Sequence, residues 1–222
     1  MDGPSASITL ARVNLLSPVM IVLAHPRAGS LDHDLAERVR AVLAQTGVRQ
    51  TGHDLYAESF DPVLTERESI AGEAWTRGTS SDQVRDDRPA ADPLVRRHRQ
   101  ELAEARALVV IHPDWWGKPP AILAGWLDRV LLADENASQT PKPAPELQRV
   151  LVINTSDQPT DPLGAESDPL GLLWRDQIGP FLGSPDLERL TFREVSRADD
   201  EQRRRWDNAV QRATAWVCGA AR

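Results

Sequence analysis

The chain has 222 residues, enough for one sizeable hydrophobic core, and carries 26 Lys and Arg against 33 Asp and Glu, a formal net charge of -7. This acidic balance argues against non-specific binding to nucleic acid, which needs a basic surface. No apolar run approaches the roughly 20 residues of a membrane span, and the single cysteine, Cys218, cannot form an internal disulfide. We therefore expect a cytoplasmic protein with no membrane span and no nucleic-acid partner.

The first predicted elements are a leader and a buried strand. Residues 1–17 lack the basic start and long apolar block of a signal peptide, and we expect them to be loosely ordered. Residues 18–222 are expected to form a single domain. The continuous apolar run 19–24 is typical of a strand in a parallel sheet that is covered on both faces. Ser30 or Asp32 can then cap a helix.

That helix is predicted to run to about residue 45, with Gly47 as its stop. Residues 48–55 are more polar, which favours a strand at the edge of the sheet. Residues 56–64 are a predicted loop. Residues 73–93 show little periodicity and many polar side chains, so we expect a long surface loop there.

Asp92 and Pro93 begin a predicted charged helix. The next apolar run, 107–111, is rich in β-branched residues and predicts a buried strand. A tight turn at 112–120 follows it, and then comes a segment with apolar residues three and four positions apart. This spacing predicts a strand, a turn and a helix packed back on the sheet.

The last third of the chain continues the alternation. Residues 149–154 and 187–195 predict strands, and residues 169–182 and 199–217 predict helices. The whole pattern predicts an α/β fold, a doubly wound five-stranded parallel sheet of flavodoxin-like order 2-1-3-4-5. The helix at 169–182 is predicted to bury its apolar residues Leu172, Leu173, Ile178 and Phe181.

Three loops follow the carboxyl ends of neighbouring strands, at 25–32, 112–119 and 154–166. In this strand order they converge on the switch point, where doubly wound sheets bind their ligands. The first loop leads into a helix N-terminus, whose free N–H groups favour a phosphate. Gly29 allows a close approach of the backbone, and Ser30 adds a hydroxyl.

Several residues of these loops have two possible roles. Arg27 either pairs with the phosphate or is solvated surface, and His25 either donates to the phosphate or closes its strand. The adjacent Trp115 and Trp116 either pack in the core or offer flat surface to a flat ligand such as an isoalloxazine. The third loop either supplies hydroxyls and amides to the other edge of that ring or forms a plain turn.

Other chemistries lack their residues. The five histidines are scattered, without a His-x-x-x-His pair or a cysteine cluster, so no metal site is predicted. The sequence contains no Gly-x-Ser-x-Gly elbow of a hydrolase. It also contains no Gly-x-x-x-x-Gly-Lys-Ser/Thr phosphate loop.

Several segments of the chain match a known family: residues 22–30 (VLAHPRAGS), 54–57 (DLYA) with 60–62 (FDP), and above all 112–117 (HPDWWG) with 120–130 (PAILAGWLDRV). In these segments the chain resembles the NAD(P)H:quinone oxidoreductases of flavodoxin-like fold. The resemblance implies a non-covalently bound flavin, FAD or FMN, with NAD(P)H as co-substrate. It also implies a homodimer with the active site at the subunit interface.

Carried over by position, the resemblance assigns cofactor-binding residues to all three loops. Those on the phosphate side are His25, Ser30, Leu31 and Asp32, with Arg27 beside them; those along the ring are Pro113, Asp114, Trp115, Trp116 and Gly117; and those at the other edge are Asn154, Thr155, Ser156 and Asp157. Asp32 departs from the pattern, because many family members have Asn there and a carboxylate near a phosphate is unfavourable. No side chain is assigned as a catalytic group.

These observations lead to two functional hypotheses. The first is a flavin-dependent NAD(P)H oxidoreductase that passes hydride from NAD(P)H through the flavin to a quinone or similar aromatic acceptor. The second is a flavodoxin-like protein that has lost redox activity and acts as a small-molecule-binding, regulatory or specialised-metabolism protein. Asp32 and the absence of the family's Phe-x-Tyr segment after the Trp-centred helix favour the second.

Overall fold

A computed structural model describes residues 18–66, 68, 92–132, 147–159 and 168–219. The predicted leader, residues 73–91 of the predicted loop at 73–93, and a further predicted polar loop at 134–145 lie outside the described residues. None of the described helices is long and apolar enough to cross a membrane.

The described strands form one sheet in which every neighbouring pair is parallel. They are β1 (Val19–Leu23), β2 (Gln50–Asp54), β3 (Ala107–Pro113), β4 (Arg149–Thr155) and β5 (Asp186–Phe192). Their spatial order is β2-β1-β3-β4-β5, which confirms the predicted doubly wound fold. The three interior strands, β1, β3 and β4, carry continuous apolar runs because helices cover both of their faces.

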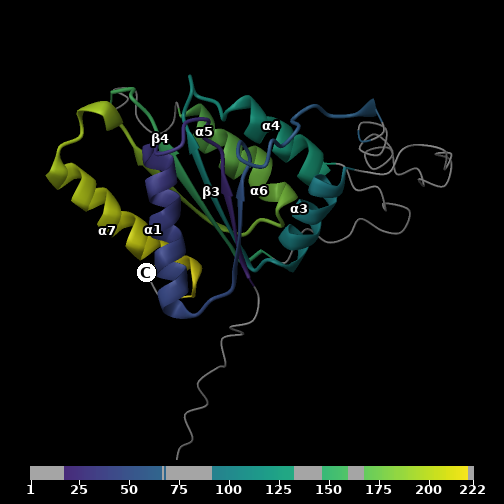
Figure 1. Cartoon of the computed structure of the whole chain (residues 1–222), viewed down its shortest axis with the longest axis horizontal. Coiled ribbons are helices and arrows are strands. Elements are labelled where there is room, and N and C mark those ends of the chain that lie inside the picture. Colours follow the sequence, from purple (N-terminus) through teal and green to yellow (C-terminus); the bar gives the residue numbers. More distant parts are fainter. Residues whose placement is uncertain (1–17, 67, 69–91, 133–146, 160–167, 220–222) are drawn as a thin grey trace, which may run out of the picture.

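The helices lie in two layers, one on each face of the sheet (Figure 1). Helices α1 and α7 cover one face, and α3, α4, α5 and α6 cover the other. They are α1 (Leu31–Thr46), α3 (Pro93–Glu104), α4 (Ala121–Leu127) with the π-helical turn η2 (Asp128–Leu132), α5 (Pro169–Leu172), the π-helical segment η4 (Leu173–Ile178), α6 (Gly179–Phe181), a 3-10 turn η5 (Val195–Arg197) and α7 (Asp200–Val217).

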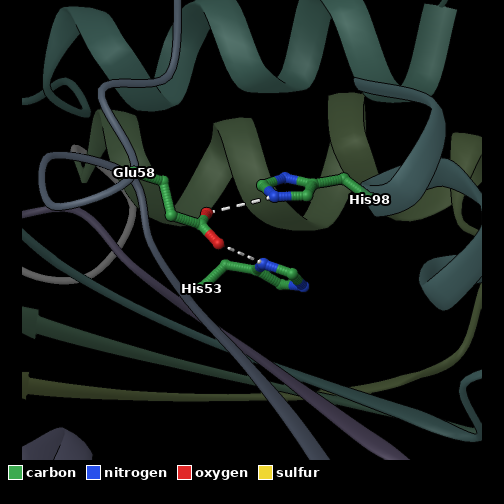
Figure 2. Close-up of side chains that lie close together, drawn as sticks. All are labelled: His53, Glu58 and His98. Carbon is green, nitrogen blue, oxygen red and sulfur yellow. Dashed lines mark hydrogen bonds and ion pairs between the residues drawn. The ribbon is translucent and has the colours of Figure 1, made fainter. Parts of the chain in front are cut away.

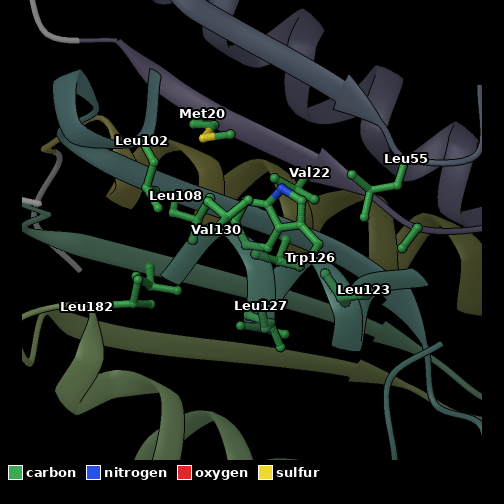
Figure 3. Packing of buried hydrophobic residues seen from close by; sticks show 14 of the residues in the cluster. Met20, Val22, Leu55, Leu102, Leu108, Leu123, Trp126, Leu127, Val130 and Leu182 are labelled. Atoms are coloured by element: carbon green, nitrogen blue, oxygen red, sulfur yellow. The ribbon is translucent and has the colours of Figure 1, made fainter. Parts of the chain in front are cut away.

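Alternate residues of each strand build the core on each face. Met20, Val22 and Leu108 point into the layer under α3 and α4, where the fully buried Trp126 fills the centre (Figure 3). The intervening strand residues point to the other face and pack on α1 and α7. Helix α1 begins in the chain segment that follows β1, and its first turn lines the same cavity as residues at the end of β3.

Local signals explain where several helices begin and end. Asp92 and Asp199 accept hydrogen bonds from the first-turn N–H groups of α3 and α7, as N-caps do. Gly47 ends α1 in the left-handed region, with φ of 70°, a conformation that glycine adopts without a Cβ clash. Ser30 occupies the N-cap position of α1, but its side chain makes no capping hydrogen bond.

Two predictions about the C-terminal third were wrong. Leu172 and Phe181, which were predicted to face inward, are exposed, and Leu170 and Trp174 are buried instead. The π-helical segment η4 lies before Phe181 and shifts the buried face there relative to the 3.6-residue period. Leu172 lies before η4, and it is two positions from each of the buried Leu170 and Trp174, which share one helix face. The fifth strand ends at Phe192 rather than at residue 195, because the chain then enters η5.

Candidate functional site

A cavity of about 470 Å³ lies at the carboxyl ends of β1, β3 and β4, beside the N-terminus of α1. We call it the switch-point cavity. The loops that were predicted to converge do meet here, and twelve of the fourteen predicted cofactor-binding residues line it. The lining consists of His25, Arg27, Ser30, Leu31, Asp32, Pro113, Asp114, Trp115, Trp116, Thr155, Ser156, Asp157, Gln158, Pro159 and Val195.

The start of α1 forms one wall. Ser30 is buried, and its Oγ lies 2.9 Å from His33 Nδ1, while His33 Nε2 lies 3.1 Å from Asp54 Oδ2 at the end of β2. These contacts fix the position of the Ser30 hydroxyl at the N-terminus of α1. Because the first-turn N–H groups of a helix have no intrahelical acceptor, the wall suits an anion.

His25 and Arg27 also line the cavity, from the loop between β1 and α1. The backbone N–H of Arg27 donates to His25 Nδ1 at 3.1 Å, which leaves Nε2 of a neutral ring as the N–H donor. Partial burial lowers the pKa of His25 below its usual value, so the ring is neutral at pH 7. The Arg27 side chain is exposed and lines the cavity.

Asp32 is the most buried carboxylate on the wall, with 2% of its surface exposed. Its Oδ2 accepts a hydrogen bond from the Thr155 hydroxyl at 2.8 Å, and its Oδ1 has no hydrogen-bond partner. Burial raises the pKa of Asp32 to about 6, even though the Thr155 hydroxyl, the backbone N–H of Asp32 and the charge of His33 act in the opposite direction. Ser30, not Asp32, occupies the N-cap position of α1, and the Asp32 carboxylate contacts Thr155 at the end of β4.

The loop between β3 and α4 presents the two indole rings at the surface. Trp115 is 40% exposed and Trp116 is 85% exposed, so the core interpretation of this pair is wrong. Trp116 has a φ of 60°, a conformation that costs a non-glycine residue free energy and that often accompanies a functional role. Asp114 Oδ1 accepts the Gly117 N–H at 2.8 Å and holds the turn in this shape.

The loop after β4 forms the third wall. The backbone N–H of Asp114 donates to the Thr155 carbonyl at 2.7 Å, which joins this wall to the preceding one. Asp157 Oδ1 accepts the Ser196 N–H at 2.7 Å, and this hydrogen bond holds the pKa of Asp157 below its usual value. The carboxylate of Asp157 is therefore ionised at neutral pH.

Gly117 and Asn154 are the two predicted residues that do not line the cavity. Gly117, with a φ of 75°, packs so closely on Pro169 that an added Cβ would lie 3.1 Å from its Cγ. The fully buried Asn154 side chain donates to His112 Nε2 at 2.9 Å and accepts from Arg189 at 2.8 Å. Asn154 thus braces the strand ends beneath the cavity, and a direct contact with a ligand is not supported.

His112 is the centre of this brace. Its Nδ1 lies 2.8 Å from the Pro113 carbonyl, and its Nε2 accepts the indole N–H of Trp174 at 3.2 Å. Complete burial lowers the pKa of His112 to about 4, so the ring is neutral. The brace fixes the end of β3, from which the tryptophan loop departs.

Sequence reasoning missed two kinds of residue at this site. Gln158, Pro159 and Val195 line the cavity but carry no recognisable motif. His33 and Asp54, which orient Ser30, come from α1 and β2 and are 21 positions apart in the sequence. No spacing rule links such a pair, because only the tertiary fold brings them together.

A second group of titratable side chains lies away from the cavity, between β2, the loop that follows it and α3 (Figure 2). His53 Nδ1 is 3.0 Å from Glu58 Oε1, and His98 Nε2 is 3.1 Å from Glu58 Oε2. The other carboxylate, Glu101, lies 2.8 Å from His53 Nε2. The ligand-type atoms of His53, Glu58 and His98 all lie within 4.8 Å of one another, which is close enough to hold a metal ion.

Trp126 argues against a metal ion in this group. Its indole N–H can only donate, and it lies 2.9 Å from His98 Nδ1, which must therefore accept. Burial, with the nearby His53 and Arg97, lowers the pKa of His98 to about 3, so the ring is neutral and its proton is on Nε2. A histidine that binds a metal through Nε2 has the opposite tautomer. We interpret the group as a hydrogen-bonded brace between β2 and α3.

The fold and the cavity together define a doubly wound α/β protein with a cavity at the switch point of the sheet, where proteins of this architecture bind their ligands. The family model described as flavodoxin-like fold (Flavodoxin_2) matches residues 17–217, and the chain belongs to this family.

Individual proteins resemble the chain more distantly. An uncharacterized NAD(P)H oxidoreductase of Escherichia coli K12, YcaK, is 32% identical over 112 residues, which are 50% of this chain and 51% of YcaK. The human ribosyldihydronicotinamide dehydrogenase [quinone] is 30% identical over 118 residues, 51% of this chain and 50% of that protein. The chain thus spans about half the length of these curated relatives.

A solved structure matches over a longer stretch. The NAD(P)H:quinone oxidoreductase from Methanothermobacter marburgensis superposes with a TM-score of 0.72 at 19% identity and covers 93% of this chain and 100% of that one. At this identity the likeness establishes the fold.

Proposed function

We propose that the chain is a flavin-dependent NAD(P)H oxidoreductase that reduces a quinone or a similar aromatic acceptor. The observation that carries the proposal is the switch-point cavity, in which a helix N-terminus faces two exposed indole rings. The relatives named above are an NAD(P)H oxidoreductase and a quinone-linked dehydrogenase, which supports the same activity.

The residues present fit a flavin. The N-terminal turn of α1, with the oriented Ser30 hydroxyl, would hold the phosphate side. Trp115 and Trp116 offer flat apolar surface for the ring system. Ser156 and Asp157 would lie at its other edge. Asp32 Oδ1 is buried and has no hydrogen-bond partner in the protein, as expected of a group whose partner is a ligand.

When bound, a flavin would supply the acceptance of hydride from NAD(P)H and its transfer to the acceptor. The protein contributes binding and orientation. The His112 brace and the Asp114–Gly117 hydrogen bond keep the tryptophan loop in one conformation, so that little ordering is needed on binding. No side chain is required to act as a nucleophile.

The test is a spectrum of the purified protein after incubation with FMN and with FAD, followed by desalting. We expect one flavin per chain with a visible absorption band. NADH and NADPH oxidation is then followed with a series of quinones, and turnover with at least one is expected. A protein that takes up neither flavin would contradict the proposal.

One observation favours a second candidate, a binding protein without redox activity. Asp32, Asp114 and Asp157 all line the cavity, and their combined negative charge opposes a phosphate. Flavin uptake without turnover of any quinone, or uptake of an uncharged aromatic molecule alone, would support this candidate over the first.

We also propose a homodimer in the cytoplasm. The resemblance to quinone oxidoreductases implies the dimer, and the 85% exposed Trp116 at the mouth of the cavity is available for a second subunit. The single cysteine suits a reducing compartment. Light scattering of the purified protein should give twice the 24.6 kDa of one chain.

A further inference from the structure

The side chain of Asp32 is the least satisfied polar group in the switch-point cavity. One of its oxygens accepts the Thr155 hydroxyl, and the other, Oδ1, is buried and has no partner. A buried carboxylate oxygen without a hydrogen bond costs folding free energy. Asp32 belongs to the first turn of α1 and lines the cavity, so this carboxylate lies next to the helix N–H groups that suit an anionic ligand.

The polar and titratable groups around Asp32 come from every element of the site. Its own helix carries His33 and Asp34, and the N-cap position carries the Ser30 hydroxyl. The other charged or titratable groups are His25 and Arg27 on the loop after β1, Asp114 on the loop after β3, and Asp157 on the loop after β4. Arg27 is the one permanent cation among the cavity-lining residues that the structure describes.

We propose that Asp32 binds the phosphate of the flavin as a neutral acid, donating a hydrogen bond from Oδ1 to a phosphate oxygen, so that the ligand and a proton bind together. An ionised Asp32 would instead direct a lone pair and a negative charge at the phosphate. Asp32 is thus a specificity-determining residue of the site. This inference rests on the proposed flavin site and adds to it a coupling between phosphate binding and pH.

The coupling has a definite sign. Burial raises the pKa of Asp32 to about 6, so in the free protein the acid form is common at low pH and rare at pH 8. If only the acid form binds the phosphate, affinity falls about tenfold for each pH unit above that pKa. Flavin binding should weaken by about 100-fold between about pH 5 and pH 8.

The experiment compares the wild-type protein with Asp32→Asn by titrating FMN and FAD into each apo-protein and following flavin fluorescence. An amide has the same shape and is a permanent donor. We expect the affinity of the variant to stay within about threefold over that pH range, apart from the titration of the FMN phosphate itself. That titration is common to both proteins, so the ratio of their dissociation constants isolates Asp32.

Two controls separate this effect from general ones. Asp34→Asn removes the same charge from an exposed position on the same turn of α1 and should keep the wild-type pH profile. Riboflavin carries the ring without the phosphate, and its binding should not distinguish wild type from Asp32→Asn. Calorimetry of FAD binding to the wild-type protein at pH 7, in two buffers of different ionisation enthalpy, should show uptake of close to one proton.

The outcomes distinguish this inference from the proposed function. Flavin that binds to both proteins with the same pH profile, or without proton uptake, overturns the role of Asp32 and leaves the flavin site standing. A pH profile that follows Asp32 with riboflavin also overturns it, because the effect would then not concern the phosphate. Failure of both proteins to bind any flavin overturns the flavin site and this inference together.

Discussion

Asp32 and Glu68 are two almost equally buried carboxylates with opposite electrostatic environments. Asp32 is 2% exposed and Glu68 is 3% exposed. Glu68 accepts hydrogen bonds from the backbone and hydroxyl of Thr65 and from Arg129, at 2.7 to 3.1 Å. Asp32 accepts one side-chain hydrogen bond, from Thr155.

The two pKa values are shifted in opposite directions. Burial raises the pKa of both groups, but the hydrogen bonds of Glu68 and the charge of Arg129 bring its pKa below the usual value. The pKa of Asp32 is raised to about 6 because burial outweighs the Thr155 hydroxyl, the backbone N–H of Asp32 and the charge of His33. A satisfied carboxylate of this kind stabilises a fold, whereas an unsatisfied one in a cavity wall points to a ligand.

Breaking the ion pair between Glu68 and Arg129 should have the largest effect on stability. Arg129→Met removes the nearer of the two cations of Glu68, since Arg99 Nη2 lies 3.9 Å from Glu68 Oε1, and it also removes a hydrogen bond to the Asp61 carbonyl. We expect the free energy of unfolding to fall by about 3–5 kcal/mol, as for other buried ion pairs that lose one partner. Urea unfolding at pH 7, followed by circular dichroism, measures this loss.

The double variant Glu68→Leu with Arg129→Met is the control. It removes both charges of the buried pair, and Asp61 and Asp92, which also lie near Arg129, are more exposed to water, so the double variant should recover most of the lost stability. If the single variant lost less than about 1 kcal/mol, Glu68 would have to find water or another partner, and the contrast with Asp32 would disappear.

Removing the unsatisfied carboxylate of Asp32 should instead raise the free energy of unfolding. The pKa of Asp32 in the folded protein, about 6, lies above its ordinary value of 3.8, so its contribution to stability is fully present below 3.8 and is lost as the pH rises through 6. Asp32→Asn removes this penalty. We expect the variant to gain up to about 3 kcal/mol over wild type at pH 8, at about 1.36 kcal/mol per pKa unit, and little near pH 4.

Asp157→Asn is the matched comparison, because Asp157 lines the same cavity but its pKa is lowered by the Ser196 N–H. That substitution should give no gain at any pH. Urea unfolding of all three proteins between about pH 4 and pH 8 provides the measurement. A difference between Asp32→Asn and wild type that does not change with pH would mean that Asp32 stays in one protonation state throughout.

Periodicity and strand order made most of the fold predictable. Apolar runs such as 19–24 and 107–111 identify buried parallel strands in any context, and the alternation with helices leaves few topologies. The errors fell where local geometry departs from regular periods. The π-helical segment η4 shifted the face that was expected to bury Phe181, and no residue pattern signals such a turn.

The candidate site was predictable as three loops but not as a set of contacts. A switch-point argument locates the loops from strand order alone, and it placed Ser30 and Trp116 in one cavity. It could not show that the Asn154 side chain contacts His112 instead of lining the cavity, because the side chain of a residue at a strand end can point to either face of the sheet. The missing partner of Asp32 Oδ1 is likewise a property of packing.

Trp116 gives the smallest expected change in stability, and it tests whether the cavity's aromatic wall serves binding rather than folding. The indole is 85% exposed, and the backbone φ of 60° is one that glycine adopts without strain. Trp116→Gly should therefore change the free energy of unfolding by no more than about 1 kcal/mol, in either direction. The same change removes a ring face worth about 1–3 kcal/mol to a stacked flat ligand, so flavin affinity should fall by roughly 10- to 100-fold. Trp126→Phe, in the buried core, should show the reverse pattern, with lower stability and nearly unchanged affinity. If Trp116→Gly instead unfolded the protein, the exposed ring would be part of the fold, and only Asp32 would remain as a group held for a ligand.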